Sequence, residues 1–167
     1  MTRESNTIDL DAFRGAMRLF PAAVSIIAAE KDGVRHGYTA TAVSSLTAEP
    51  ARILTCADKT NGNHQLIVEA QRFSVNLLAE DQAGLASRFA AKPVESRFDS
   101  GEWRVNAGGA PMLAGAVIAF DCVLERYVEL ETHCVFFGLI VASAVEEKSA
   151  LLYSDRAYGA FRPVDSA

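Results

Sequence analysis

The sequence lacks the residue patterns that mark metalloproteins, disulfide-rich secreted proteins and membrane proteins. Its cysteines are Cys56, Cys122 and Cys134, and neither a CxxC nor an HExxH pattern occurs among the 167 residues. The cysteine count is odd, and the first residues contain no apolar core of signal-peptide length. Both features are typical of a cytoplasmic protein with reduced thiols. We therefore expect no metal site, no disulfide and a cytoplasmic location.

Long apolar runs and excess positive charge are lacking too. The most apolar stretch, residues 22–29, contains Ser25 and falls far short of the ~20 residues that span a bilayer. The formal net charge of -5 disfavours binding to nucleic acid phosphates or to an anionic membrane surface. We expect neither nucleic acid nor a membrane among the partners.

What remains is an ordinary globular composition. The sequence is 50% hydrophobic and 22% charged, which suits a folded chain that needs no disulfides. Two stretches read as internal loops, residues 92–101 and 106–111, and neither is long enough to separate domains. We expect a single domain over residues 1–167, with its core at about residues 9–161.

The spacing of apolar residues predicts one helix followed mostly by strands. Leu10, Phe13, Met17 and Phe20 fall on one helical face, and Asp9 is a plausible N-cap. Further strands are predicted over 23–29, 34–41, 52–56, 73–78, 116–127, 133–145 and 151–153, and further helices over 62–70 and 81–89. Because helices and strands do not alternate regularly, the pattern favours a β-barrel with helices packed on it.

Two of the strand pairings can be predicted as well. Asp32 and Gly33 stand between two apolar runs and predict a tight hairpin. The strands over 116–127 and 133–145 are long enough to pair as an antiparallel ribbon.

The most informative segment is GYTATAVSSLTAEP, residues 37–50, which is rich in hydroxyl side chains. These are Thr39, Thr41, Ser44, Ser45 and Thr47. Hydroxyl and backbone N–H groups can hold a phosphate or a polar ring edge, and Ala40 and Ala42 would let a flat ring approach the backbone. The alternative is a solvent-exposed strand and turn.

A second candidate segment runs from Cys56 to Asn61, between a strand and a helix. A helix N-terminus favours anions, so Lys59 could pair with a phosphate, and Thr60 and Asn61 could touch a ligand or simply cap the helix. Cys56 has no neighbouring base that would make it a nucleophile, and inert packing is the better interpretation.

Two single residues are further candidates. Asn76 interrupts an apolar strand, and its amide would be satisfied either by a cofactor ring or by neighbouring backbone. His133 begins a long apolar strand and could donate a hydrogen bond to a dinucleotide or tune a flavin, or be structural.

Taken in order, these segments resemble the short-chain flavin reductase family. The matching pieces run from Phe13 to about Phe161 and are FRGAM, AAVSIIAA, GYTATAVSSLTAEP, FSVNLL, LASRFA, RF, PML, FDC, THCVFFGLI and LLYSDRAY. The resemblance implies a homodimeric FMN-binding split β-barrel that reduces FMN or FAD with NADH or NADPH. It also implies a separate oxygenase that receives the reduced flavin.

The resemblance also implies roles for individual positions. The isoalloxazine edge would be lined by Thr39, Ala40 and Thr41. The ring and ribityl chain would be followed by Ser44, Ser45 and Leu46. Close to the ring and the ribityl hydroxyls would pass Cys56, Ala57 and Asp58. Thr60 and Asn61 would lie towards the phosphate, Asn76 and Leu77 beside the flavin, and Ser87, Arg88 and Phe89 near the phosphate and adenylate end. His133 would lie near the nicotinamide, as the one catalytic candidate, and Tyr158 would close on the site.

Other functions compatible with a split barrel remain open at this point. A pyridoxamine-phosphate oxidase-like enzyme would need several basic side chains for its substrate, and the Arg and Lys residues here are scattered. A flavin- or haem-binding protein without reductase activity is a further alternative, because a fold does not determine a function.

Overall fold

The computed structural model describes residues 8–91, 96–105 and 109–164. Its strands are β1 (Ala22–Ala23), β2 (Ser25–Lys31), β3 (Val34–Ala40), β4 (Val43–Ala48), β5 (Ala51–Asp58), β6 (Arg72–Leu77), β7 (Trp103–Val105), β8 (Pro111–Leu113), β9 (Ile118–Glu129), β10 (His133–Val145), β11 (Leu151–Ser154) and β12 (Ala157–Ala160). Its helices are α1 (Leu10–Arg18), α2 (Asn63–Ala70) and α3 (Ala83–Ala90), with 3-10 turns over Lys59–Asn61, Glu80–Gln82 and Arg97–Asp99.

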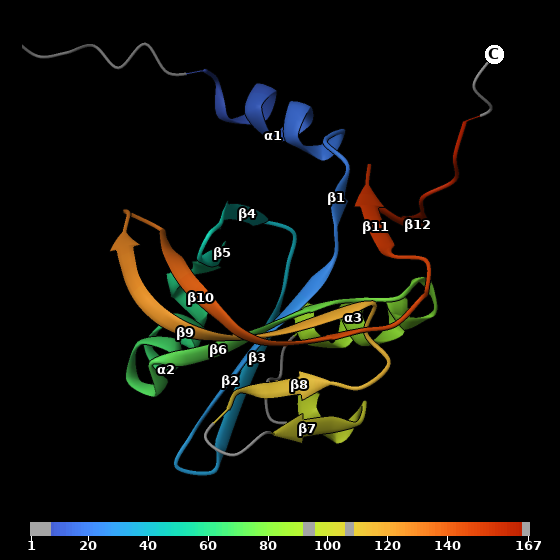
Figure 1. Ribbon diagram of the computed structural model, residues 1–167. Helices are drawn as coiled ribbons and strands as arrows, with labels where there is room; N and C mark the ends of the chain where they lie inside the picture. The colour runs from blue at the N-terminus through green and yellow to red at the C-terminus, as the bar shows by residue number, and fades with distance from the viewer. Residues whose placement is uncertain (1–7, 92–95, 106–108, 165–167) are drawn as a thin grey trace, which may run out of the picture.

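The centre of the molecule is an antiparallel sheet of seven strands in the order β3-β2-β6-β9-β10-β5-β4. The sheet curls until β3 contacts β5, which makes an incompletely closed barrel (Figure 1). Two small sheets, β1-β11-β12 and β7-β8, flank it. The predicted fold class, mostly β with interposed helices, is confirmed.

Strand β2 shows why the barrel needs a helix on its outside. Its first five residues are all buried, without the alternation expected of a half-exposed strand. Ile27 packs into the barrel interior with Phe73 and Phe136, whereas Ile26 packs with Phe89 of α3 in a second core. Both faces of β2 are therefore covered, and α3 is fixed against the outer face.

The sequence predicted most elements and missed the shortest. The strand 133–145 has the predicted bounds, and the helix 62–70 begins one residue late, at Asn63. Asp32 and Gly33 both have positive φ in the β2–β3 turn, as the predicted hairpin requires. Strands β7, β8 and β12 were missed, because three or four residues carry no periodicity, and β4 was considered only as an alternative for its hydroxyl-rich segment. Residues 92–95 and 106–108 of the predicted loops lie outside the described residues.

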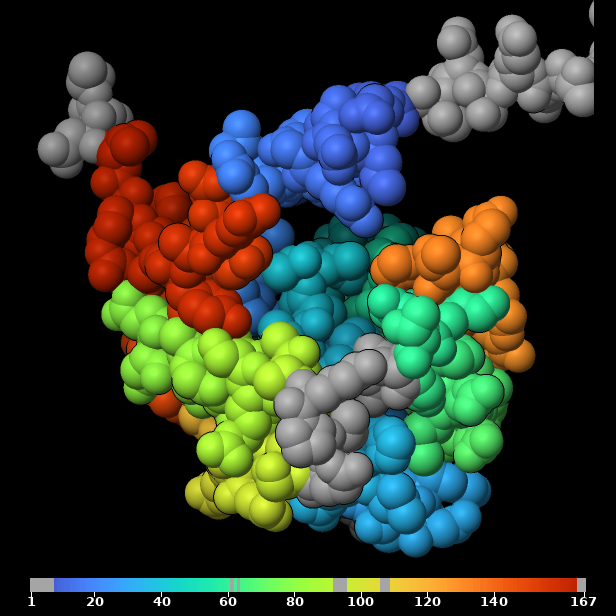
Figure 2. All heavy atoms as spheres, turned by 180° about the vertical axis from the view of Figure 1, so that it is seen from behind, coloured from blue at the N-terminus to red at the C-terminus, as the bar shows by residue number. Residues whose placement is uncertain are grey.

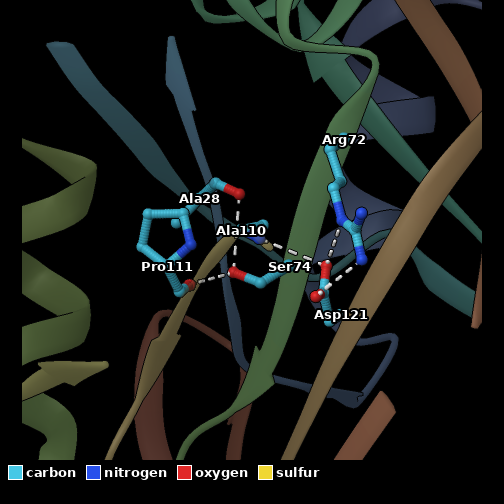
Figure 3. A network of polar contacts seen from close by, with 6 residues as sticks. All are labelled: Ala28, Arg72, Ser74, Ala110, Pro111 and Asp121. Carbon is cyan, nitrogen blue, oxygen red and sulfur yellow. Dashed lines mark hydrogen bonds and ion pairs between the residues drawn. The ribbon is translucent and has the colours of Figure 1, made fainter. Parts of the chain in front are cut away.

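A buried polar network fastens the short strand β8 to the barrel (Figure 3). Asp121 of β9 accepts two hydrogen bonds from Arg72 of β6, at 3.0 and 3.1 Å, and one from the backbone N–H of Ala110 at 3.2 Å. The hydroxyl of Ser74 lies between the carbonyl oxygens of Ala28 and Pro111, within hydrogen-bonding distance of both, and its single proton is directed to the closer one, that of Pro111. Strands β2, β6 and β9, which pair through their backbones, are thereby joined through side chains as well, and β8, which pairs with β7, is attached to them through side chains.

Helix α1 stands off from the barrel and is linked to it through β1 (Figure 1). As predicted, Asp9 caps it, because its Oδ2 accepts from the N–H groups of Asp11 and Ala12, both at 3.1 Å. None of the helical residues of α1 is buried. Within the described ranges, no helix is long and apolar enough to cross a membrane.

Candidate functional site

A polar cleft of about 290 Å³ opens between the ends of four elements. Its lining residues are Tyr38, Thr39, Ala40, Thr41, Ala42, Cys56, Asp58, Phe89, Ala90, Arg97 and His133. They come from the end of β3 and the residues after it, the end of β5, the end of α3 and the start of β10, except for Arg97, which comes from the 3-10 turn Arg97–Asp99. Seven of the predicted site residues are thus brought together here: Thr39, Ala40, Thr41, Cys56, Asp58, Phe89 and His133.

Strand register explains how His133 reaches this cleft. In the antiparallel β10–β5 pair, His133 lies directly opposite Asp58, and Val135 lies opposite Cys56. Residues that are opposite one another share a face of the sheet, so His133, Asp58 and Cys56 all point to the same side. The two strands deliver these three side chains to one wall of the cleft.

Several polar side chains of the cleft already have partners inside the protein. The Thr39 hydroxyl donates to the carbonyl of Ala86 at 2.6 Å, which ties β3 to α3. Asp58 caps the following 3-10 turn by accepting from the N–H of Thr60 at 2.8 Å. Lys59 donates to Glu129 at 3.1 Å, so the cation considered for a phosphate is held in an ion pair.

The ionisable groups of the cleft differ in exposure. His133 is exposed, and its Nδ1 lies 2.8 Å from the hydroxyl of Thr132, which orients the ring. Burial raises the pKa of the Cys56 thiol above its ordinary value. Cys56 therefore stays protonated at neutral pH, in agreement with its interpretation as an inert residue. Burial also raises the pKa of Tyr38, so that its hydroxyl stays neutral.

The structure does not bring Asn76 to the cleft. Its side chain is fully buried, and its amide nitrogen donates to the carbonyl of Ile26 at 3.0 Å and to Ser74 at 2.8 Å. Its amide oxygen accepts from the N–H of Leu113 at 2.8 Å. Both ends of the amide are satisfied within the protein, so the geometry matches the alternative of a structural asparagine rather than a contact to a flavin ring.

The other predicted residues lie around the cleft rather than in its lining. Ser44, Ser45 and Leu46 lie on the exposed strand β4, Ala57 points into the barrel core, Thr60 and Asn61 end the 3-10 turn, and Ser87 and Arg88 are exposed on α3. The hydroxyl of Tyr158 on β12 lies 3.5 Å from that of Ser87, so the C-terminal strands do approach α3.

Sequence reasoning missed Arg97 as a site residue. Arg97 lines the cleft and is only 4% exposed. Its Nη1 donates to the carbonyl of Gly37 at 2.7 Å, and its Nη2 donates to that of Ala91. The available signal was the pair Arg97-Phe98 among the matching segments, which alone gave no role.

A second, apolar groove of about 410 Å³ lies beneath α1, where Figure 2 shows the helix separated from the barrel. It is lined by Phe20, Pro21, Ala22, Ala23, Ser25, Thr41, Val43, Ile53, Val75, Leu77, Ile118 and Phe120. Thr41 lines both the groove and the polar cleft, so the two are adjacent. Leu77, predicted to lie beside the flavin, belongs to this groove.

An open antiparallel barrel with a cleft at the strand ends, lined by small residues, hydroxyls and one histidine, is the arrangement of a split-barrel flavoprotein. Comparison with known proteins specifies it further. The profile of the flavin reductase-like domain matches residues 17–162, and the chain belongs to this family.

Individual relatives agree with this assignment. The FMN reductase (NADH) RutF of Ancylobacter novellus is 37% identical over 155 residues, which cover 92% of this chain and 86% of the relative. A flavin reductase domain protein from an Arthrobacter species superposes with a TM-score of 0.87 at 27% identity, over 93% of this chain and 98% of that one. BorF, the flavin reductase component of a bacterial two-component tryptophan halogenase, superposes with a TM-score of 0.83 at 27% identity, over 93% of this chain and 100% of that one.

Proposed function

We propose that this chain is an NADH-dependent flavin reductase, which transfers a hydride from NADH to FMN or FAD. The observation that carries the proposal is the cleft itself: small residues and hydroxyls from 39–42 form one wall, and His133 stands on another. The similarity to an FMN reductase that uses NADH supports FMN and NADH as the preferred pair.

The residues of the cleft suit hydride transfer between two flat rings. Nicotinamide and flavin carry that reactivity themselves, so the protein has to hold the rings in contact and exclude competing geometries. Ala40 and Ala42 leave room for a ring against the β3 backbone. The Thr41 hydroxyl and neighbouring N–H groups would stabilise negative charge on the reduced ring. Hydride transfer between the rings needs no general base, so it is compatible with a Cys56 thiol that stays protonated.

We place the phosphate or adenylate end of the flavin towards Ser87, Arg88 and Tyr158. Arg88 lies in the last turn of α3, next to Phe89 of the cleft wall. Among the described residues Arg88 forms no ion pair, so its charge is available to a phosphate. Thr60 and Asn61, in the 3-10 turn after β5, are further candidates for the phosphate.

The fate of the reduced flavin follows from the openness of the cleft. Thr41, Ala42 and His133 are all exposed at its rim, so a product could leave without a large rearrangement. We propose that reduced flavin passes to a separate oxygenase. The similarity to the reductase component of a two-component halogenase supports this role.

The proposed activity is tested by following the loss of NADH absorbance under air, with and without added FMN, FAD or riboflavin. Flavin-dependent oxidation is expected, fastest with FMN, and NADPH is expected to be the poorer donor. If no flavin supports oxidation of either nucleotide, the chain is not a reductase. A haem Soret band or a permanently bound flavin would then indicate one of the alternative split-barrel functions.

His133 provides a sharper test of the site. The variant His133→Ala is expected to raise the KM for NADH by about tenfold while the Kd for FMN changes little, because one lost hydrogen bond to a charged ligand costs about that factor. Steady-state kinetics and flavin titration measure the two quantities. Thr132→Val, which removes the hydroxyl beside Nδ1, should show a smaller effect of the same kind. An unchanged KM in folded His133→Ala would remove His133 from the nicotinamide site.

We further propose that two copies pair through α1 and the apolar groove. Leu10, Phe13 and Met17 on one face of α1, and Phe20 just after the helix, are each about half exposed or more. A patch of this kind is rare on a monomer. Phe13→Glu should yield a monomer in sedimentation experiments. Gly15→Glu is the matched control, since no atom lies within 4 Å of the added Cβ position. A dimer that persists in Phe13→Glu would exclude this interface.

A further inference from the structure

One wall of the cleft is built on an aromatic cluster. Phe89 lines the cleft and is fully buried. Its ring packs edge-on against Phe98 at a centroid distance of 5.1 Å and at a tilt against Trp103 at 5.5 Å, and the rings of Phe98 and Trp103 lie 4.8 Å apart. The position of this wall therefore depends on how the cluster is held against the barrel.

Strand β3 lies directly against this cluster at Gly37. A Cβ atom at this position would come within 2.9 Å of Cε1 of Phe89 and 3.1 Å of Cζ of Phe98. Only glycine allows so close an approach. The backbone of β3, which two residues later contributes Thr39 to the cleft lining, is thus in contact with the ring of Phe89.

The buried side chain of Arg97 bridges the two walls. One nitrogen of its guanidinium donates to the carbonyl of Gly37 on β3, and another donates to the carbonyl of Ala91, directly after α3. The planar fork of arginine can reach two carbonyl groups in fixed directions, which a lysine ammonium on its flexible stem does not reproduce. The bond from Thr39 to Ala86 is a second connection between the same two elements.

We propose that Arg97 is a positioning residue that sets the width of the flavin cleft, by fixing the α3 wall with Phe89 at a defined distance from β3. The inference rests on the proposed flavin reductase function. In this role the guanidinium has to donate in two fixed directions, and a positive charge alone would not be sufficient.

The test compares Arg97→Lys, which keeps the charge and loses the fork, with Arg97→Met, which loses both. Both variants are expected to raise the Kd and the KM for FMN by about tenfold with a smaller effect on kcat, because a displaced α3 wall loses contacts with the bound flavin; tenfold in Kd corresponds to about 1.4 kcal/mol. Trp103 is the one tryptophan of the sequence, so its fluorescence reports on the aromatic cluster. Its emission should shift in both variants without any ligand.

Arg72→Met is the matched control, because it breaks the buried pair with Asp121 away from the cleft. It should lower the melting temperature but leave the Kd for FMN and the Trp103 emission unchanged. Wild-type affinity in Arg97→Lys, or an equal loss of affinity in Arg72→Met, would overturn the proposal. A wild-type protein that binds no flavin would instead contradict the proposed function, and the ligand-free Trp103 spectra would still decide whether Arg97 holds the cluster.

Discussion

Ala42→Trp is expected to weaken FMN binding by roughly 10- to 100-fold, because overpacking a close-fitting site costs about 1–3 kcal/mol. Ala42 lines the cleft and is exposed, so the larger side chain fills the space of the ligand without entering the core. Its carbonyl accepts from the N–H of Cys56 at 3.2 Å, which fixes this backbone against β5 and prevents it from moving away.

Equilibrium dialysis against FMN measures the change directly, and thermal unfolding shows whether the fold is retained. Ala48→Trp is the matched control, since Ala48 is equally exposed at the end of β4 but lies outside the lining of the cleft. It should bind FMN like the wild type. If Ala42→Trp also binds FMN with wild-type affinity, the flavin does not occupy this cleft.

Asp121→Ala is expected to have the largest effect on stability, a loss of about 3 kcal/mol of unfolding free energy, because it removes a buried carboxylate that accepts three hydrogen bonds. Asp121 is 1% exposed, and its removal leaves Arg72 and the N–H of Ala110 without their acceptor. For a chain of this size the melting temperature should fall by about 6–12 °C.

Glu125→Ala on the same strand is the appropriate comparison. Glu125 also forms a two-point pair with an arginine, Arg52, but both side chains are about one-third exposed. Exposed pairs contribute little, so the melting temperature should hardly change. Equal losses in the two variants would mean that burial of the Arg72–Asp121 network does not determine its contribution.

The parts of the fold that follow from local sequence were predicted well. The β2–β3 hairpin depends on Asp32 and Gly33, a pair that readily adopts the positive φ angles the turn requires. The strand His133–Val145 is long and rich in aromatic and β-branched residues. Strand β12, with the sequence AYGA, has neither property and exists because it pairs with β11.

The site was predictable where neighbouring residues form it and less so where distant segments meet. The segment 39–42 could be identified from its own composition, and His133 from the resemblance. Arg97 could not, because its acceptors, Gly37 and Ala91, belong to other elements. The apolar strand around Asn76 indicated that its amide is buried. The sequence did not identify the partners of this amide on β2 and β8, because they are distant along the chain.

The central claim, that flavin binds in the cleft between β3, β5 and α3, is tested most directly by the reactivity of Cys56. Cys122 and Cys134 are fully buried, whereas Cys56 is partly exposed and lines the cleft. Burial raises the pKa of Cys122 to about 12, which keeps that thiol unreactive. Burial raises the pKa of Cys56 as well, so the reaction is run at alkaline pH. Because Cys56 is the one of these three thiols that is partly exposed, a small alkylating reagent should modify it first, and Cys56→Ser should abolish the reaction.

The measurement is the rate of Cys56 alkylation, determined by mass spectrometry, as a function of FMN concentration. FMN is expected to slow the reaction strongly, with half-protection at its independently measured Kd. An alkylation rate that stays unchanged when the protein is saturated with FMN would contradict the assignment of this cleft as the flavin site.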